Sequence, residues 1–245
     1  MISCDPVGDA AIRIKFNEDV TPTLNRKIRS FCRRLSHQAV EAIIEWVPSF
    51  DSVTVYYSPY HMSYETIRNM LLELASGDML LGEDTKMLVK IPVFYGGSAG
   101  PDLEKVAKKS GLSVNEVIEK HSGVDYLIYM IGFLPGFPYL GGLPKELATP
   151  RLDNPRSSVP AGSVGIAGSQ TGAYPLASPG GWNLIGQTPV KLFDPDRDAP
   201  FLYQAGDKIR FVPVSESDYR TIEKQVHNNT FQVEKEVIRN EQPSD

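Results

Sequence analysis

The chain has 245 residues, of which 25 are basic and 30 acidic, so its formal net charge at pH 7 is −5. This length is sufficient for one large domain or two ordinary ones, each with a core of its own. The lack of a basic excess argues against nucleic acid as a partner. Hydrophobic residues make up 41% and charged residues 22% of the sequence, the proportions of an ordinary globular protein.

A reducing, cytoplasmic location is expected from the cysteines and the N-terminus. Cys4 and Cys32 are far apart and show no metal-ligand or redox spacing, so a disulfide scaffold is excluded as the main source of stability. Residues 1–15 lack the apolar run of a signal peptide. The longest strongly apolar stretch, 126–134, is much shorter than the roughly 20 residues of a membrane span, so no membrane partner is expected.

Strands and helices alternate in the pattern of the first 91 residues. Ile12, Ile14 and Phe16 fall on one face of a strand, and Thr21-Pro22 is a typical helix start. The expected elements are a strand at 11–16, a helix from 22, strands at 40–47 and 52–57, a helix capped by Ser63 and a strand at 87–93. The order β-α-β-β-α-β predicts an α+β fold with a ferredoxin-like domain over residues 1–92.

Two short helices are predicted to follow this domain. Pro101 begins the first and Gly111 ends it, whereas Ser113 and Glu116 form a capping box for the second. The glycines just before Pro101 predict an exposed linker between about residues 92 and 101.

Glycine and proline become abundant in the second half of the chain. Residues 132–200 contain 22 of them in 69 positions, or about 32%, against a usual combined share of about 12%. Apolar residues persist through this region, so it predicts short strands joined by tight turns rather than disorder. Further strands are expected at 163–167, 173–177, 182–186, 190–193 and 208–214, with a last helix at 219–226. We therefore expect a compact β domain over 93–220 and a polar C-terminal tail over 221–245.

Residues 157–190 contain no Asp, Glu, Lys or Arg, although Arg156 and Lys191 stand directly on either side. Many residues of this run are polar nonetheless, because it contains several serines, threonines and amides. Neutral polar groups and glycine backbone suit a ligand groove or a subunit interface. The interior of a small barrel would also explain the glycines, but it explains the polar side chains less well. We therefore favour a groove or an interface.

Two turns inside this run are candidates for ligand binding. Residues 168–172, with Gln170 and Thr171, offer hydroxyl, amide and backbone donors between two strands. Residues 178–182 place Gly180 and Gly181 beside Trp182, which allows a planar group to approach the backbone.

Any charged group of the site must come from outside the run, where the nearest candidates are Arg151, Asp153 and Arg156, and then His121. The arginines would bind a carboxylate or phosphate at two points, or else tie the 149–160 loop to the domain. His121 shares a helix with apolar residues, so a structural, hydrogen-bonded role is favoured over that of a general base.

Familiar catalytic signatures are absent. The sequence has no G-x-S-x-G elbow, H-E-x-x-H motif or P-loop, and its four histidines form no ligand pair, so no metal site is predicted. Residues 194–198 superficially suggest a calcium loop but lack its glycine and glutamate, so an exposed acidic turn is expected.

Four glycine-rich motifs are specific enough to indicate a family. They are Gly132-Phe-Leu-Pro-Gly-Phe-Pro-Tyr-Leu-Gly-Gly142, Val159-Pro-Ala-Gly-Ser-Val-Gly-Ile-Ala-Gly168, Gln170-Thr-Gly172 and Pro179-Gly-Gly-Trp182. With them, about residues 5–220 resemble the allophanate hydrolase subunit 1 family. The resemblance implies a ferredoxin-like N-terminal domain followed by a cyclophilin-like β-barrel.

The resemblance also implies a function within a complex. Similar members include the B component of a bacterial 5-oxoprolinase, which with the A and C components opens 5-oxo-L-proline to L-glutamate and consumes ATP as co-substrate, with Mg²⁺. The C component carries related barrels. Other members inhibit a sporulation sensor histidine kinase by docking on its dimerisation region, and this remains the alternative. Either way a hetero-oligomer is expected, with no tightly bound cofactor.

The site that the resemblance implies is the barrel groove, where the backbone and the arginines would stabilise negative charge on a lactam or acyl-phosphate oxygen. The catalytic candidates are Arg151, Arg156 and His121, and the substrate-binding candidates are Gln170, Thr171, Gly180, Gly181 and Trp182.

Overall fold

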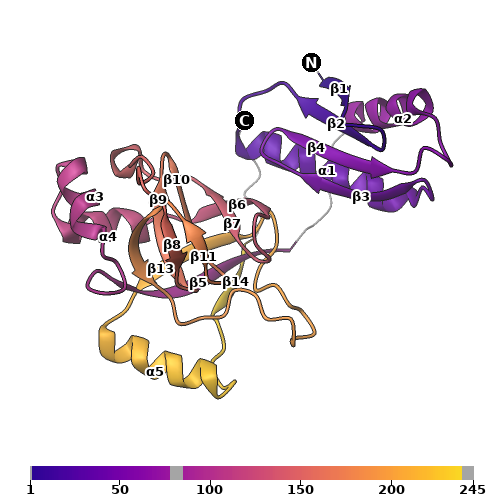
Figure 1. The fold of residues 1–245 in the computed structure, drawn as a ribbon. Coiled ribbons are helices and arrows are strands. Elements are labelled where there is room, and N and C mark those ends of the chain that lie inside the picture. The colour runs from indigo at the N-terminus through magenta and orange to yellow at the C-terminus, as the bar shows by residue number, and fades with distance from the viewer. Residues whose placement is uncertain (1, 78–84, 239–245) are drawn as a thin grey trace. The chain divides into compact units, whose positions relative to one another are not determined.

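A computed structural model of the protein describes residues 2–77 and 85–238 (Figure 1). The chain divides into two compact units, residues 1–84 and 85–245. The division falls eight residues before the domain boundary expected at residue 92. No helix among the described residues is long and apolar enough to cross a membrane.

The N-terminal unit is a four-stranded antiparallel sheet with two helices packed against it. Its elements are β1 (Ile2–Pro6), β2 (Ala11–Phe16), α1 (Pro22–Gln38), β3 (Ile43–Pro48), β4 (Ser52–Tyr57) and α2 (Tyr64–Ser76), and the strand order is β1-β2-β4-β3. Ile12, Ile14 and Phe16 are buried against the helices, as their alternation predicts. The predicted caps are also confirmed, because Thr21 and Ser63 each accept a hydrogen bond from a backbone N–H in the first turn of their helix.

The predicted order β-α-β-β-α-β is wrong for this unit, whose order is β-β-α-β-β-α. The segment expected to close the sheet is a strand, β5 (Lys86–Tyr95), but it lies in the second unit, and β1 takes the edge position beside β2. Leu88, Val89, Ile91 and Val93 of β5 are all buried. Val89, Ile91 and Val93 belong to the core of the barrel, so most of the apolar residues of β5 are buried by the second unit.

The second unit contains a closed barrel of seven strands. Hydrogen bonding runs in the order β12-β9-β10-β7-β6-β13-β5, and β5 then pairs with β12 to close the ring. Its strands are β6 (Tyr126–Ile131), β7 (Pro138–Gly141), β9 (Ser163–Ala167), β10 (Gln170–Ala173), β12 (Asn183–Gln187) and β13 (Lys208–Pro213), together with β5. The expected β-barrel is therefore present, and its cyclophilin-like type stays a prediction.

Short elements surround the barrel (Figure 1). They are α3 (Leu103–Ser110), α4 (Val114–Ser122), the 3₁₀ turn η1 (Lys145–Leu147), the two-stranded ribbon of β8 (Arg156–Val159) and β11 (Ser178–Gly180), α5 (Glu216–His227) and β14 (Lys235–Ile238). The capping box predicted at Ser113 and Glu116 is present at the start of α4.

Two expectations about exposed segments are wrong. The linker expected at 92–101 is partly the end of β5, and Ala99 and Gly100 are buried, with no room for a Cβ at Gly100 beside the Ile185 carbonyl. The helix expected at 219–226 is confirmed as α5, so the polar tail expected from residue 221 begins too early, and residues 235–238 of that tail form β14, which pairs with residues 86–89 of β5. Polar residues dominate this stretch, and most of its described side chains are exposed.

Only part of the charge-free run of 157–190 is barrel interior. Val164, Ile166, Ala173 and Ile185 belong to the barrel core, so the barrel-interior alternative holds for these positions, whereas Tyr174 and Trp182 belong to a separate cluster. Residues 162–167, 171–175 and 182–186 are buried in and beside β9, β10 and β12. The polar side chains there satisfy buried backbone groups. The amide of Asn183, for example, donates to the carbonyls of Pro150 (2.8 Å) and Ile166 (3.2 Å). Neutral groups do this without the cost of burying a charge.

Candidate functional site

One cavity of about 400 Å³ opens where the end of the charge-free run meets the 132–142 motif. Its size is within the range of pockets that bind small molecules. The residues that line it are Phe133, Phe137, Tyr139, Arg151, Pro155, Tyr174, Pro179, Gly180, Gly181 and Trp182.

The walls of this aromatic cavity are rings that meet edge to face. Phe137 lies at the centre, with ring centroids 5.4 Å from Tyr174, 5.5 Å from Trp182 and 5.3 Å from Tyr139. Such pairs add about 0.5–1.5 kcal/mol each beyond simple burial, so the cavity has a rigid wall. Phe137, Tyr174 and Trp182 belong to a small core cluster separate from that of the barrel interior.

Gly180 is required by the packing of this wall. A Cβ on Gly180 would lie 2.5 Å from the Tyr174 hydroxyl oxygen and 3.1 Å from a methyl group of Val159. A Cβ on Gly181 would meet nothing closer than Pro155 at 3.6 Å. Gly180 therefore lets the tyrosine ring reach the ribbon, whereas a Cβ at Gly181 would fit in ordinary van der Waals contact with Pro155.

Arg151 supplies the single formal charge among the lining residues. Its guanidinium makes no hydrogen bond or ion pair with any residue in the described part of the chain. Burial raises the pKa of Tyr139 and of Tyr174 above the ordinary value of 10, while Arg151 acts in the opposite direction on both. Both tyrosines therefore keep their phenolic protons at neutral pH. The cavity offers one cation, two hydroxyl donors and aromatic surface, which suits a small anionic ligand with a flat ring.

Arg156 lies beside the cavity but is already engaged. One guanidinium nitrogen donates to the carboxylate of Asp102 at 2.9 Å, and the other donates to the carbonyl of Trp182 at 3.3 Å. Asp102 also accepts a 2.7 Å hydrogen bond from the backbone N–H of Leu184. This arrangement matches the structural alternative for Arg156, which ties β8 to the start of α3 and to the turn before β12 that holds Trp182.

His121 and Thr171 lie inside the barrel, away from the cavity lining. The His121 ring is fully buried, with Nδ1 2.8 Å from the Tyr95 hydroxyl and Nε2 2.8 Å from Oγ1 of Thr171. Because Thr171 donates its own proton to the Gly165 carbonyl, it must accept from Nε2–H, and Tyr95 then donates to Nδ1. Desolvation lowers the pKa of His121 to about 3, so the ring is neutral and structural.

The structure thus gathers four of the eight predicted residues in one cavity: Arg151, Gly180, Gly181 and Trp182. Gln170 begins β10 opposite Ala167 and is not part of the lining. The six lining residues that were not predicted as single candidates are Pro155, Pro179 and four aromatic residues: Phe133, Phe137, Tyr139 and Tyr174. The sequence did contain a signal for Phe133, Phe137 and Tyr139, because they belong to the 132–142 motif.

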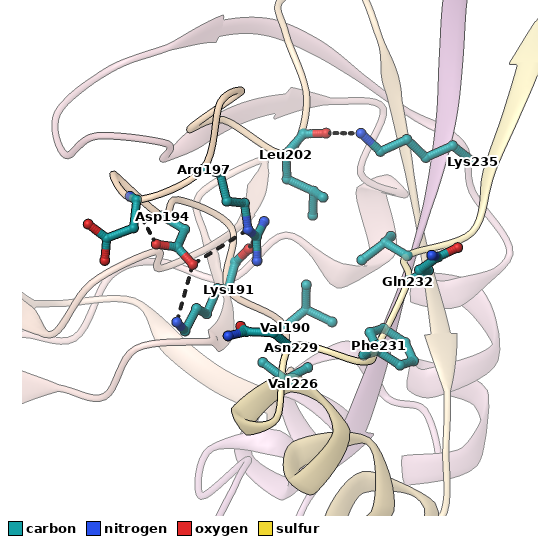
Figure 2. A pocket seen from close by; sticks show the side chains of 12 residues that line it. Val190, Lys191, Asp194, Arg197, Leu202, Val226, Asn229, Phe231, Gln232 and Lys235 are labelled. Atoms are coloured by element: carbon teal, nitrogen blue, oxygen red, sulfur yellow. Dashed lines mark hydrogen bonds and ion pairs between the residues drawn. The ribbon is translucent and has the colours of Figure 1, made fainter.

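A second cavity, of about 520 Å³, lies between the 190–202 loop and the segment after α5 (Figure 2). Four of its five charged side chains, those of Lys191, Asp194, Arg197 and Lys235, already have partners. Asp194 accepts from Lys191 at 3.2 Å and pairs with Arg197 at 3.5 Å, and Lys235 donates to the Leu202 carbonyl. The exposed acidic turn expected at 194–198 is confirmed for residues 195–198, whereas Asp194 is buried and organises the loop. Within the described ranges, no three His, Cys, Asp or Glu residues are grouped so that they could hold a metal ion.

Comparison with known proteins identifies the family. The family described as carboxyltransferase domain, subdomain C and D, matches residues 2–203. The chain belongs to this family. Its resemblance to the allophanate hydrolase subunit 1 family is thereby confirmed.

Members of this carboxyltransferase family that resemble the chain over most of its length include two bacterial proteins named as the B component of 5-oxoprolinase. The protein of Bacillus subtilis is 43% identical over 88% of this chain and 94% of its own length. That of Escherichia coli O157:H7 is 44% identical over 87% of this chain and 96% of its own. The fold is shared with the urea carboxylase of Kluyveromyces lactis (TM-score 0.81, 18% identity), of which the chain covers 24%.

Proposed function

We propose that this chain is the B component of an ATP-dependent 5-oxoprolinase complex, which opens 5-oxo-L-proline to L-glutamate and is active only with the A and C components. The proposal is carried by the end-to-end similarity to two proteins that bear this component's name. The aromatic cavity supports it independently, because 5-oxo-L-proline is a small flat lactam with one carboxylate.

The lining of the cavity explains why partner proteins would be needed. Among its ten residues there is no carboxylate, histidine or lysine, and the two tyrosines are held protonated. Such a cavity can bind and orient an anion, but it lacks a base for lactam opening. The base and the site for ATP and its Mg²⁺ are therefore assigned to the A and C components, since this sequence has no phosphate-binding loop.

The test is reconstitution from the three purified components. ATP hydrolysis that depends on 5-oxo-L-proline, together with glutamate formation, should appear when this chain is combined with the A and C components and should be absent with this chain alone. The matched control omits only this chain from the mixture. Turnover by the isolated chain, or full activity in its absence, would contradict the proposal.

The alternative, inhibition of a sporulation sensor histidine kinase, makes a different prediction in the same preparation. It expects the isolated chain to reduce autophosphorylation of the kinase, and it expects the three-component mixture to show no turnover of 5-oxo-L-proline.

A further inference from the structure

Phe133 has an unfavourable backbone conformation. Its φ is +66°, in the left-handed region that residues other than glycine seldom occupy. The backbone N–H of Leu134 donates to the carbonyl of Gly132 at 2.8 Å, so Phe133 is the central residue of a γ-turn. With a positive φ, this turn is the rare and strained form.

The position of the Phe133 side chain also does not favour folding, because its apolar ring is exposed. It is 66% exposed and lies outside the core clusters of the described residues, and its ring meets that of Phe137 at 5.7 Å and perpendicular. An exposed phenyl ring on a strained residue contributes little to folding. Such outliers persist where the surrounding structure enforces them, and they are common at ligand sites.

The surroundings do enforce this turn. Phe137 donates its backbone N–H to the Leu134 carbonyl at 3.0 Å and accepts from Gly132 N–H at 3.1 Å. Gly136 has a φ of +82°, and a Cβ there would lie 2.8 Å from Cβ of Phe193. The loop is therefore fixed on both sides of Phe133, and its ring is held at the aromatic cavity that it helps to line.

We infer that Phe133 is a ligand-contacting residue, whose ring packs on the flat lactam ring of 5-oxo-L-proline while Arg151 pairs with the carboxylate. This inference rests on the proposed function. The methylene groups and amide plane of the lactam present an apolar face that an exposed phenyl ring would cover. The favourable contact between the ring and the substrate then offsets the free energy of folding that the strained, exposed phenylalanine costs.

Three variants of the full chain test this, each assembled with the A and C components. Phe133→Gly relieves the backbone and removes the ring, Phe133→Tyr keeps both the strain and the ring, and Ala39→Gly is the matched control. Ala39 is another non-glycine residue with positive φ (+45°), but it ends α1 in the N-terminal unit. Both glycine variants should keep or raise the melting temperature of the isolated chain.

Only Phe133→Gly should raise KM for 5-oxo-L-proline, by about tenfold, the loss of one good aromatic contact. Ala39→Gly should have the wild-type KM, Phe133→Tyr, which keeps the ring, should raise KM by much less than Phe133→Gly, and all three should assemble normally. An unchanged KM in Phe133→Gly would overturn the inference. So would failure of Phe133→Gly to assemble, because Phe133 would then be a contact with a partner protein. If the wild-type complex itself does not turn over 5-oxo-L-proline, the proposed function fails instead.

Discussion

Arg151 and Arg156 are five positions apart and were equivalent candidates in the sequence, but they have different partners in the fold. Arg151 has no hydrogen bond or ion pair among the described residues and lines the aromatic cavity. Arg156 pairs with Asp102, whose side chain is only 11% exposed. Substitution of Arg151 should therefore affect the activity of the complex, and substitution of Arg156 should affect the stability of the chain.

Arg151→Lys should lower the activity of the assembled complex by roughly ten- to a hundredfold, about 1.4–2.7 kcal/mol, without changing the melting temperature. Arg156→Lys should instead lower the free energy of unfolding by about 1–3 kcal/mol, because the lysine loses the guanidinium's simultaneous contacts with Asp102 and Trp182. Arg220→Lys, at an exposed ion pair on α5, is the control and should change neither property. Chemical denaturation and turnover, measured on the same three variants, test whether Arg151 binds the ligand and Arg156 stabilises the fold. Equal stability of the Arg151 and Arg156 variants would contradict it.

The buried His121 predicts how stability depends on pH. Its folded pKa of about 3 lies below the ordinary value of 6.5, so between these values the unfolded chain binds more protons than the folded one. This contribution to stability is complete above pH 6.5 and is lost, by about 1.4 kcal/mol per unit, as pH falls toward 3.

Urea denaturation at several pH values between 7 and 4 measures this slope. His121→Leu should be less stable at pH 7, because Tyr95 and Thr171 lose their shared partner, but its stability should fall less steeply with acidification. A slope identical to that of the wild type would show that His121 does not titrate in this way.

At the scale of elements, β5 decides where the second unit begins. Residues 88–93 pair in parallel with β13, residues 94 and 95 pair with β12, and residues 86–89 also pair with β14. A fragment covering 85–245 should therefore fold alone, whereas one covering 93–245, the boundary expected from composition, should not. Circular dichroism and cooperative thermal unfolding of the two fragments make the comparison. Equal folding of both would show that the first half of β5 is dispensable.

Most individual elements could be predicted from local signals. The alternation of apolar residues located β2, and the capping residues located the starts of α1, α2 and α4. Local signals could not predict the unit to which β5 belongs, because a buried strand has the same apolar sequence pattern in either sheet. Its partners β13 and β14 are more than 100 residues away in the sequence.

At the scale of the whole chain, the aromatic cavity is assembled from three distant segments. Residues 133–139, 151–155 and 174–182 each contribute part of the lining, and no one of them forms a site alone. The motifs that carry the family resemblance supply two of these segments. Arg151 comes from outside them.

The sequence by itself determined the family, a compact β domain in the second half and four of the residues that line the aromatic cavity. These follow from local composition, turn chemistry and specific motifs. The tertiary structure alone decided that Arg156 is paired, that His121 and Thr171 belong to the barrel interior, and that Phe133 stands strained and exposed at a cavity. Burial and partnership are set by strand pairings across the barrel, and such long-range contacts leave no local pattern in the chain.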